Sequence, residues 1–153
     1  MPRAGFYAIH NSSIRFGRDG RWYADGAPIT NPRIAGLFAR SVHRLPDGTY
    51  ELRIAEERAA ISVDDTAYVV TAALVDDAGR VWIDLNDETR EALDLRSLSV
   101  GAADVLYCRV KDGREWARFL RPAYYQLADR IVADAAGGFA FATATGRYPI
   151  GRR

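Results

Sequence analysis

Four Asp-Gly dipeptides constrain the fold of this chain more than any other feature of its sequence. They lie at Asp19-Gly20, Asp25-Gly26, Asp47-Gly48 and Asp112-Gly113. Asp-Gly favours the tight turn of a β-hairpin, because that turn needs a positive φ at both of its central residues. Each dipeptide therefore predicts a reversal between two antiparallel strands, and together they predict a chain rich in antiparallel sheet.

The first two turns enclose the segment RWYA and predict a three-stranded meander over residues 14–29. Helical signals follow at once. Asn31 can cap a helix, Pro32 suits its first turn, and apolar residues then recur at helical spacing. These apolar residues are Ile34, Leu37, Phe38, Val42 and Leu45. The next Asp-Gly turn ends this unit, and the segment TYELRI after it is predicted to be a strand.

The centre of the chain carries longer apolar strands. The segment AAISV at 59–63 is a short strand, and AYVVTAALV at 67–75 is a continuous apolar run typical of a central strand. RVWIDL at 80–85 is predicted to return antiparallel to it. The polar segment from Asn86 to Gly101 is predicted to be mainly loop, with a short strand at 91–95, and its sequence defines no role for it.

A second hairpin-and-helix unit follows. VLYCRV and EWARFLR flank Asp112-Gly113, a helix is predicted from Pro122 to Asp134, and FAFATAT is predicted to be a last strand. An offset of ninety residues places Pro122 on Pro32 and Leu127 on Leu37. The predicted core residues of the second helix are Tyr124, Leu127, Ala128 and Val132. Upstream of each helix, Asp112-Gly113 is matched with Asp19-Gly20, with three residues fewer before the proline in the second unit.

The predicted fold class is therefore α+β, with two similar halves that each run hairpin, helix, strand. The predicted organisation is an N-terminal arm at 1–12, one half at 13–65 and the other at 66–153. Each half would lay one helix across an antiparallel sheet. Coincidence is the alternative, because hairpins followed by proline-started helices are common.

Charge and hydropathy exclude some function classes. The 153 residues include 21 basic and 20 acidic side chains, for a net charge of +1. That balance does not suggest a bulk electrostatic grip on nucleic acid, although it permits a local basic patch. No apolar run approaches the roughly 20 residues of a membrane helix, and the first residues hold no signal-peptide core. We expect a cytoplasmic protein that binds neither nucleic acid nor membrane.

The sequence contains no catalytic, cofactor or metal-binding signature. Cys108 is the single cysteine, and the two histidines, His10 and His43, lie far from it in sequence. A buried structural thiol is the favoured interpretation over a nucleophile. Paired acids occur at 56–57, 64–65 and 76–77, where adjacent carboxylates are usually exposed turn residues. We therefore expect no catalytic residues, no cofactor and no metal site.

Three motifs in order resemble a known family. They are DGRWYADGAPITNPRIAGLFAR, YELRIAEERAAISVDDTAYVV and LYCRVKDGREWARFLRPAYYQLAD. Together they resemble the bacterial proteins of domain-of-unknown-function family 1285, over about residues 14–150. The resemblance implies a two-part α+β fold built on a repeated core motif and a role in signal transduction. It implies no set of catalytic residues.

The second hairpin offers the candidate binding site. A two-residue turn at Asp112-Gly113 pairs Val110 with Glu115, Arg109 with Trp116, Tyr107 with Arg118 and Val105 with Leu120. Side chains alternate between the two faces of a strand. Leu106, Cys108, Ala117 and Phe119 would then face the core. Tyr107, Arg109, Trp116 and Arg118 would share the opposite face.

Two interpretations of that opposite face stay open. The four side chains either satisfy one another or pack against the other half, or they bind an anionic small molecule or a protein partner. The sequence favours a non-enzymatic binding or regulatory module. The alternatives are a small enzyme with a site in the cleft between the halves, and a structural subunit of a larger assembly.

Overall fold

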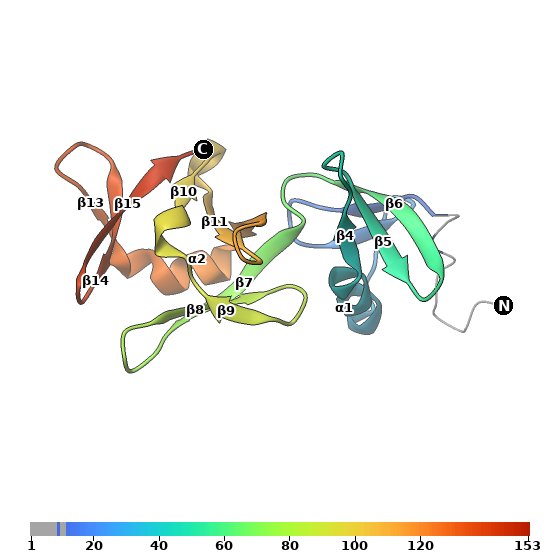
Figure 1. The fold of residues 1–153 in the computed structure, drawn as a ribbon, viewed down its shortest axis with the longest axis horizontal. Coiled ribbons are helices and arrows are strands. Elements are labelled where there is room, and N and C mark those ends of the chain that lie inside the picture. Colours follow the sequence, from blue (N-terminus) through green and yellow to red (C-terminus); the bar gives the residue numbers. More distant parts are fainter. Residues whose placement is uncertain (1–8, 10–11) are drawn as a thin grey trace. The chain divides into compact units, whose positions relative to one another are not determined.

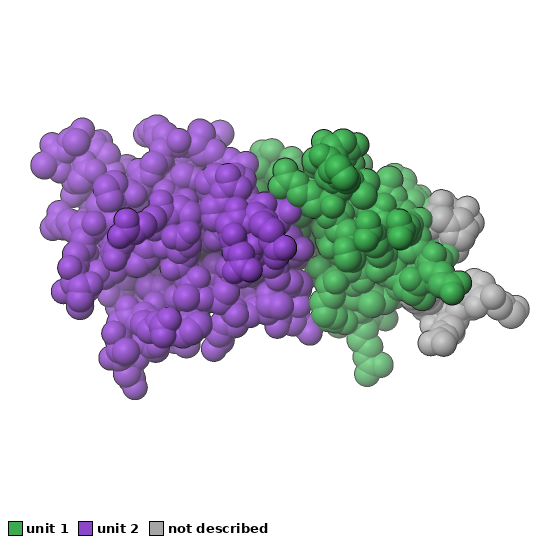
Figure 2. All heavy atoms as spheres, viewed as in Figure 1, with its two compact units in different colours: residues 1–67 green, residues 68–153 purple. Residues whose placement is uncertain are grey.

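The computed structural model describes Ile9 and residues 12–153. These residues form two compact units, with the division between Ala67 and Tyr68 (Figure 2). The predicted arm at 1–12 lies outside the described residues except for its positions 9 and 12. In the described part of the chain the structure is mostly β, with two sheets and two α-helices. The α+β class is therefore correct, with strands dominating.

The first unit is one sheet of six strands and one helix. Its elements are β1 (Ile14–Phe16), β2 (Trp22–Ala24), β3 (Ala27–Pro28), α1 (Pro32–Arg40), β4 (Val42–Arg44), β5 (Tyr50–Ile54) and β6 (Glu57–Val63). The strand order is β3-β2-β1-β6-β5-β4, and Figure 1 shows β6, β5 and β4 side by side. Only β1 and β6 run parallel. The predicted meander and the strand after Asp47-Gly48 are both confirmed.

Helix α1 is shorter than the sequence pattern predicts. Asn31 Oδ1 accepts a hydrogen bond from Arg33 N at 2.9 Å, which caps the first turn as expected. The helix ends at Arg40, and the Ser41 hydroxyl donates to Leu37 O at 2.6 Å. Val42 was predicted to be helical, but it begins β4 and pairs with Leu52. The apolar spacing continued past the helix because β4 begins with an apolar residue, the half-buried Val42.

Aromatic rings fill the core of the first unit. Phe16, Trp22 and Phe38 are 0%, 3% and 1% exposed. The Phe16 and Trp22 ring centroids lie 4.7 Å apart, and those of Trp22 and Phe38 lie 5.6 Å apart in an edge-to-face arrangement. Edge-to-face and tilted pairs at these distances add to the stabilisation from burial alone. Of the predicted helix residues, Phe38 is buried, whereas Ile34 and Leu37 are half-buried.

The second unit is a larger sheet with one helix. Its strands are β7 (Tyr68–Val75), β8 (Val81–Leu85), β9 (Arg90–Ala92), β10 (Ser99–Val100), β11 (Leu106–Val110), β12 (Glu115–Phe119), β13 (Ile131–Ala133), β14 (Phe139–Thr143) and β15 (Gly146–Arg152). Helix α2 spans Arg121–Leu127, and the short 3-10 turns are η2 (Leu95–Ser97), η3 (Ala102–Asp104) and η4 (Ala128–Arg130). The strand order is β13-β14-β15-β10-β11-β12-β7-β8-β9. The segment predicted to be mainly loop thus contributes two short strands, β9 and β10.

Helix α2 also ends earlier than predicted. It stops at Leu127, and the predicted helical residue Val132 lies instead in β13, opposite Ala140. The β-branched pair Ile131 and Val132 favours this strand. Ala123 and Leu127 are fully buried, whereas Tyr124 and Ala128 are half-buried.

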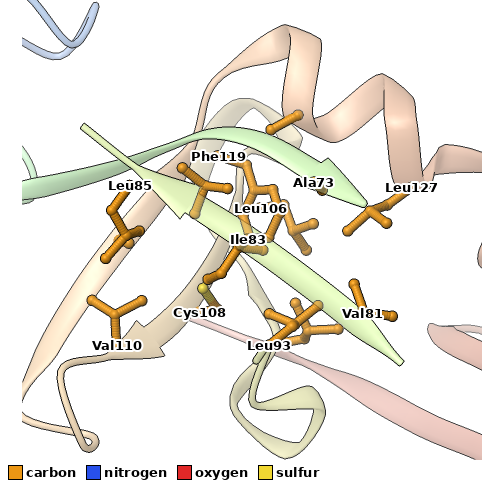
Figure 3. Packing of buried hydrophobic residues seen from close by; sticks show 14 of the residues in the cluster. Ala73, Val81, Ile83, Leu85, Leu93, Leu106, Cys108, Val110, Phe119 and Leu127 are labelled. Atoms are coloured by element: carbon orange, nitrogen blue, oxygen red, sulfur yellow. The ribbon is translucent and has the colours of Figure 1, made fainter. Parts of the chain in front are cut away.

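The core of the second unit is mainly aliphatic (Figure 3). It gathers Val70, Ile83, Leu85, Leu106, Cys108, Val110, Phe119 and Leu127, with smaller neighbours. Cys108 is 0% exposed, so its predicted burial is confirmed. Burial raises the pKa of the Cys108 thiol, and the nearby carboxylates of Glu91 and Asp94 raise it further. Its inertness toward thiol reagents stays a prediction.

Strands β10–β15 are joined in the order β12-β11-β10-β15-β14-β13, which matches the order β3-β2-β1-β6-β5-β4 in the first unit. The parallel pair also matches, because β10 runs parallel to β15 as β1 does to β6. Strands β7–β9 are additional and extend the sheet beyond β12. We call two residues corresponding when they hold the same place in this shared strand order.

Under this correspondence the residue matches differ in register from those predicted for the repeat. By strand order, the turn at Asp112-Gly113 between β11 and β12 corresponds to the one at Asp25-Gly26, not to Asp19-Gly20. The first backbone bond of each helix, Ala35 N to Asn31 O and Tyr124 N to Leu120 O, sets an offset of 89 instead of 90. Phe38 therefore corresponds to Leu127, and both are buried.

Candidate ligand-binding face

The β11–β12 hairpin has the predicted register. Tyr107 lies opposite Arg118, Arg109 opposite Trp116, and Val110 opposite Glu115. The turn residues Asp112 and Gly113 have φ of 57° and 78°, as a two-residue Asp-Gly turn requires. The fourth predicted pair, Val105 with Leu120, is absent because both residues lie beyond the strands. Val105 O accepts from Gly101 N instead, and Leu120 N donates to Val70 O.

The two faces of the hairpin separate as the alternation predicts. The predicted core residues Leu106, Cys108, Ala117 and Phe119 are all at most 4% exposed. Glu115 also turns to that side, since it lies opposite Val110, and it is 8% exposed. The opposite face carries Tyr107, Arg109, Trp116 and Arg118, as predicted from the register.

These four side chains contact one another. The Arg109 guanidinium lies 4.0 Å from the centroid of the Trp116 ring, and Arg118 Nη1 donates to the Tyr107 hydroxyl at 3.4 Å. The Arg153 guanidinium lies 4.2 Å from the Tyr107 ring and 4.9 Å from the Trp116 ring. We call these residues, Tyr107, Arg109, Trp116, Arg118 and Arg153, the aromatic–arginine face.

Sequence reasoning missed Arg153. Its position follows from the sheet order, because β15 pairs with β10 in parallel and β10 pairs with β11. Arg153 follows β15 directly and so lies near Tyr107 of β11. Arg153 N donates to Val100 O at 2.9 Å and fixes the backbone there. No local sequence pattern reports a parallel pair between strands so far apart in the chain.

The floor of the aromatic–arginine face is tightly packed. Tyr107 is 6% exposed, and Arg109, Trp116 and Arg118 are half-buried. A Cβ atom on Gly101 would lie 2.8 Å from Tyr107 Cε2, so the absence of a side chain there lets the ring lie against the loop. Ser99 pairs with Tyr107, is 7% exposed, and its Oγ has no hydrogen-bond partner among the described residues.

The face has an excess of positive charge. Arg109 and Arg153 contact aromatic rings, and in the described part of the chain neither has a carboxylate within ion-pair distance. Arginine stacked on a ring keeps its in-plane N–H donors available to a ligand. The arrangement is thus suited to hold a planar anionic group, such as a carboxylate, or a phosphate.

A second group of polar side chains surrounds Lys111 in the second unit. Lys111 Nζ lies 2.5 Å from Asp87 Oδ2, 3.1 Å from Thr89 Oγ1 and 5.0 Å from the centroid of the Tyr68 ring. Burial raises the pKa of Asp87, but hydrogen bonds from Lys111 and Thr89 outweigh it and leave that pKa lowered. Burial, with the carboxylates of Asp87 and Glu115, raises the pKa of Tyr68 to about 12.

This cluster is not tuned for acid–base chemistry near neutral pH. Its tyrosine stays protonated and its aspartate stays ionised, whereas a general acid or base needs a pKa near the working pH. Sequence reasoning treated residues 86–90 as a solvated loop and missed the cluster. The contact partner, Lys111, lies more than twenty residues away in sequence.

The paired acids predicted to be turn residues mostly have structural partners. Asp64 pairs with Arg15, and Asp76 accepts from Trp82 Nε1 at 2.9 Å. The hydrogen bond from Trp82 is the main cause of the lowered pKa of Asp76. The described residues contain no group of three or more histidine, cysteine or acidic side chains placed to hold a metal. Nor do they form a helix of the length and hydropathy that crossing a bilayer demands.

The fold and this face define the class of the protein: a two-unit α+β protein whose second unit presents stacked arginines. No protein-family model matches the chain, and no curated protein matches it. Its fold is similar to two crystal structures of DUF1285 family proteins. The one from Silicibacter pomeroyi DSS-3 has a TM-score of 0.70 and 20% identity, over 98% of this chain and 86% of that one.

The second structure, a DUF1285 family protein from Shewanella baltica OS155, has a TM-score of 0.61 and 19% identity. That match covers 78% of this chain and 92% of the other. At these identities the likeness is one of fold. The resemblance to family 1285 indicated by the sequence motifs is thus confirmed in the fold of both neighbours.

Proposed function

We propose that this protein is a non-enzymatic binding or regulatory module whose aromatic–arginine face recognises an anionic ligand. The observation that carries the proposal is the pair Arg109 and Arg153, stacked on Trp116 and Tyr107 without a carboxylate partner in the described residues. The two guanidinium groups lie 4.0 and 4.9 Å from the centroid of the same Trp116 ring, and a bound anion would offset their like charges. The stacked rings fix both arginines before the ligand arrives, which lowers the entropic cost of binding.

The chemistry favours a small anion with an apolar part. The guanidinium forks would take a carboxylate or phosphate bidentately, and the rim of Trp116 would cover the apolar part. A protein partner that inserts an acidic side chain would meet the same groups. The resemblance to family 1285 implies signal transduction, and a switch driven by an anionic ligand is consistent with that role.

We also infer that the two units are copies of one motif of six strands and a helix. The matching strand order and the matching parallel pair support this. Two backbone hydrogen bonds support it further, because Asp64 N donates to Phe16 O where Arg153 N donates to Val100 O. By this correspondence, Arg153 holds the position of Asp64, and Tyr107 holds that of Tyr23.

The correspondence strengthens the functional proposal. In the first unit Arg15 lies 4.2 Å from the Tyr23 ring and forms an ion pair with Asp64. The positive charge of Arg15 is thus neutralised within the unit. In the second unit an arginine replaces the aspartate, so the same tyrosine position gathers positive charge instead.

The test measures the affinity of the full chain for inorganic pyrophosphate by isothermal titration calorimetry. Arg109→Ala and Arg153→Ala should each weaken binding at least about tenfold, because each removes a charged contact from the centre of the site. Arg80→Ala is the matched control, since it removes an arginine stacked on Trp82 in the same unit. The control should bind as the wild type does.

Thermal melting separates binding from folding. Both face variants should melt within a few degrees of the wild type, because partly exposed arginines contribute little to stability. If both unfold, or if the Arg80 control loses as much affinity, the aromatic–arginine face is a structural junction and the proposal is wrong.

A further inference from the structure

The opposite side of the same strands contains a pocket of about 230 Å³. Val100 and Leu106 line it, and they alternate along β10 and β11 with Ser99 and Tyr107 of the aromatic–arginine side. Tyr124 of α2 and Phe139 of β14 close its walls. The strands and helix that line the pocket, β10, β11, β13–β15 and α2, all belong to the second unit and are labelled in Figure 1. The pocket is separate from the site proposed above.

At two positions that line the pocket, small side chains stand where the first unit has large rings. Val100 pairs with Leu106 and Arg152, as Phe16 pairs with Trp22 and Val63 in the first unit. Replacement of a phenylalanine and a tryptophan by valine and leucine removes two rings from the core. Interiors are otherwise close-packed, so a space of this size in the corresponding place is a feature to be explained.

The walls are apolar and partly open to solvent. Phe139 is 50% exposed although its strand neighbours Ala140 and Phe141 are buried. An exposed phenylalanine at the wall of a pocket gives a ligand apolar surface to cover. The volume is below the roughly 300–1,000 Å³ of pockets for drug-sized ligands, so the ligand must be small.

Two opposite charges also line the pocket. Arg152 stands at the position of Val63, and Asp104 belongs to the turn η3. Both are exposed, and neither has an ion-pair or side-chain hydrogen-bond partner in the described part of the chain. An apolar pocket with one cation and one anion at its lining matches a ligand that carries both charges beside an apolar group.

The backbone under Asp104 is unusual. Ala103 and Asp104 have φ of 58° and 59°, and Asp104 corresponds to Gly20, where φ is 79°. The loops match because Gly101 N donates to Val105 O as Gly17 N donates to Arg21 O. Aspartate tolerates this left-handed conformation, and in the place of the glycine it adds a carboxylate to the lining of the pocket.

From these observations we infer that the pocket of the second unit binds a small zwitterion with an aromatic or branched apolar body, the chemistry of an apolar amino acid. The ligand body takes the place of the rings found in the first unit. Its carboxylate pairs with Arg152, and its ammonium group pairs with Asp104.

Three related probes test the assignment by calorimetry on the full chain: L-phenylalanine, 3-phenylpropionate, which lacks the ammonium group, and 2-phenylethylamine, which lacks the carboxylate. L-Phenylalanine should bind at least tenfold tighter than either of the others. In Arg152→Ala, L-phenylalanine should bind no tighter than 2-phenylethylamine, because its carboxylate has lost its partner. In Asp104→Asn, L-phenylalanine should bind no tighter than 3-phenylpropionate, because its ammonium group has lost its partner. Arg147→Ala, an exposed arginine of the same strand that does not line the pocket, is the control and should change nothing.

A filled pocket provides the second test. Leu106→Trp, alone or with Val100→Phe, restores the side chains of the first unit and should reduce binding of every probe below detection. Because such variants can misfold, their far-UV and near-UV circular dichroism must match the wild type before binding is interpreted. The inference is overturned if no probe binds at millimolar concentration, if the acid and the zwitterion bind equally, or if the Arg152 and Arg147 variants behave alike.

Discussion

Phe16 in the first unit and Val100 in the second hold the same place in their sheets. Each has an antiparallel neighbour on one side and a parallel neighbour on the other. Around Phe16 the rings of Trp22 and Phe38 fill the space, whereas around Val100 a pocket opens. One backbone arrangement therefore supports a closed core in one unit and an accessible site in the other.

The other side of the same strands shows the same contrast in charge. Tyr23 lies beside Arg15, which Asp64 neutralises, whereas Tyr107 lies beside Arg153. Ser99 takes the place of Arg15, and its buried hydroxyl has no hydrogen-bond partner among the described residues. At these described positions of the first unit, side chains of the unit itself fill the core and pair the Arg15 charge. The second unit is open on one side and positive on the other, so function is expected to reside there.

The largest effect that distinguishes the units should come from their helices. Phe38→Ala should lower the free energy of unfolding by about 3–5 kcal/mol, and Leu127→Ala by about 2–5 kcal/mol, because both side chains are almost fully buried. Leu37→Ala should cost less, since Leu37 is half-buried. Urea denaturation measures all three, with Tyr125→Ala, at a residue 67% exposed, as the control. Equal losses at Leu37 and Leu127 would contradict the corrected 89-residue register.

Some elements of the fold could be predicted from the sequence and others could not. The β11–β12 hairpin was predicted residue by residue, because Asp112-Gly113 fixes the turn and alternation then fixes both faces. Both helix ends were missed, because Val42 and Val132 continue the apolar spacing into strands. A local pattern does not separate these cases, because Val42 and Val132 keep the apolar spacing of the helix although both lie half-buried in strands.

Long-range pairing was the other gap. The β1–β6 and β10–β15 pairs join residues about fifty positions apart, and such parallel pairs have no turn signal. Arg153, Arg152 and the pocket all depend on the second of these pairs. Four of the five residues of the aromatic–arginine face were thus predicted from a hairpin, and the fifth needed the structure.

The ion pair Lys111–Asp87 of the second unit should contribute more to the free energy of unfolding than the exposed pair Arg15–Asp64 of the first. The contribution of Lys111–Asp87 should also depend on pH. Asp87→Asn should cost about 1.5–3 kcal/mol at pH 7, the range for hydrogen bonds to a charged group, because Asp87 is 7% exposed and bonded to Lys111. The pKa of Asp87 is lowered in the folded state. Its contribution is therefore complete above the unfolded-state pKa and is lost as the pH falls through the lowered value.

Urea denaturation from pH 7 to pH 3 follows this contribution. The difference between wild type and Asp87→Asn should shrink from about pH 5 downward, because the wild-type carboxylate then takes up a proton. A difference that is the same at pH 3 and pH 7 would mean that the substitution disturbs packing and not charge.

A pair of corresponding glycines gives a smaller, more specific comparison. A Cβ on Gly101 would lie 2.8 Å from Tyr107 Cε2, and a Cβ on Gly17 would lie 3.0 Å from Tyr23 Cε2 and 2.5 Å from Asp19 Oδ1. Gly101→Ala should cost about 1–3 kcal/mol, because the buried Tyr107 ring has little room to move. Gly17→Ala should cost less, since Tyr23 is half-buried and the Asp19 side chain is exposed, although moving Asp19 gives up its hydrogen bonds from Arg21 N and the Tyr23 hydroxyl. Chemical denaturation of the two variants measures the order, and the reverse order would break the correspondence.

The smallest expected effect belongs to the neutralised arginine of the first unit. Arg15 and Asp64 form an ion pair with side chains 42% and 34% exposed. A double-mutant cycle with Arg15→Ala and Asp64→Ala should give a coupling energy of only about 0.2–1 kcal/mol, because water screens an exposed pair. The pair matters instead for charge. Asp64→Ala leaves the Arg15 guanidinium on Tyr23 without its carboxylate, which brings the first unit closer to the second. If that guanidinium then adds a weak pyrophosphate site absent from the wild type, the lack of an acidic partner is what makes such a position bind anions. If no binding appears, the stacked Arg109–Trp116 pair, which the first unit lacks among its described residues, is the necessary part of the site.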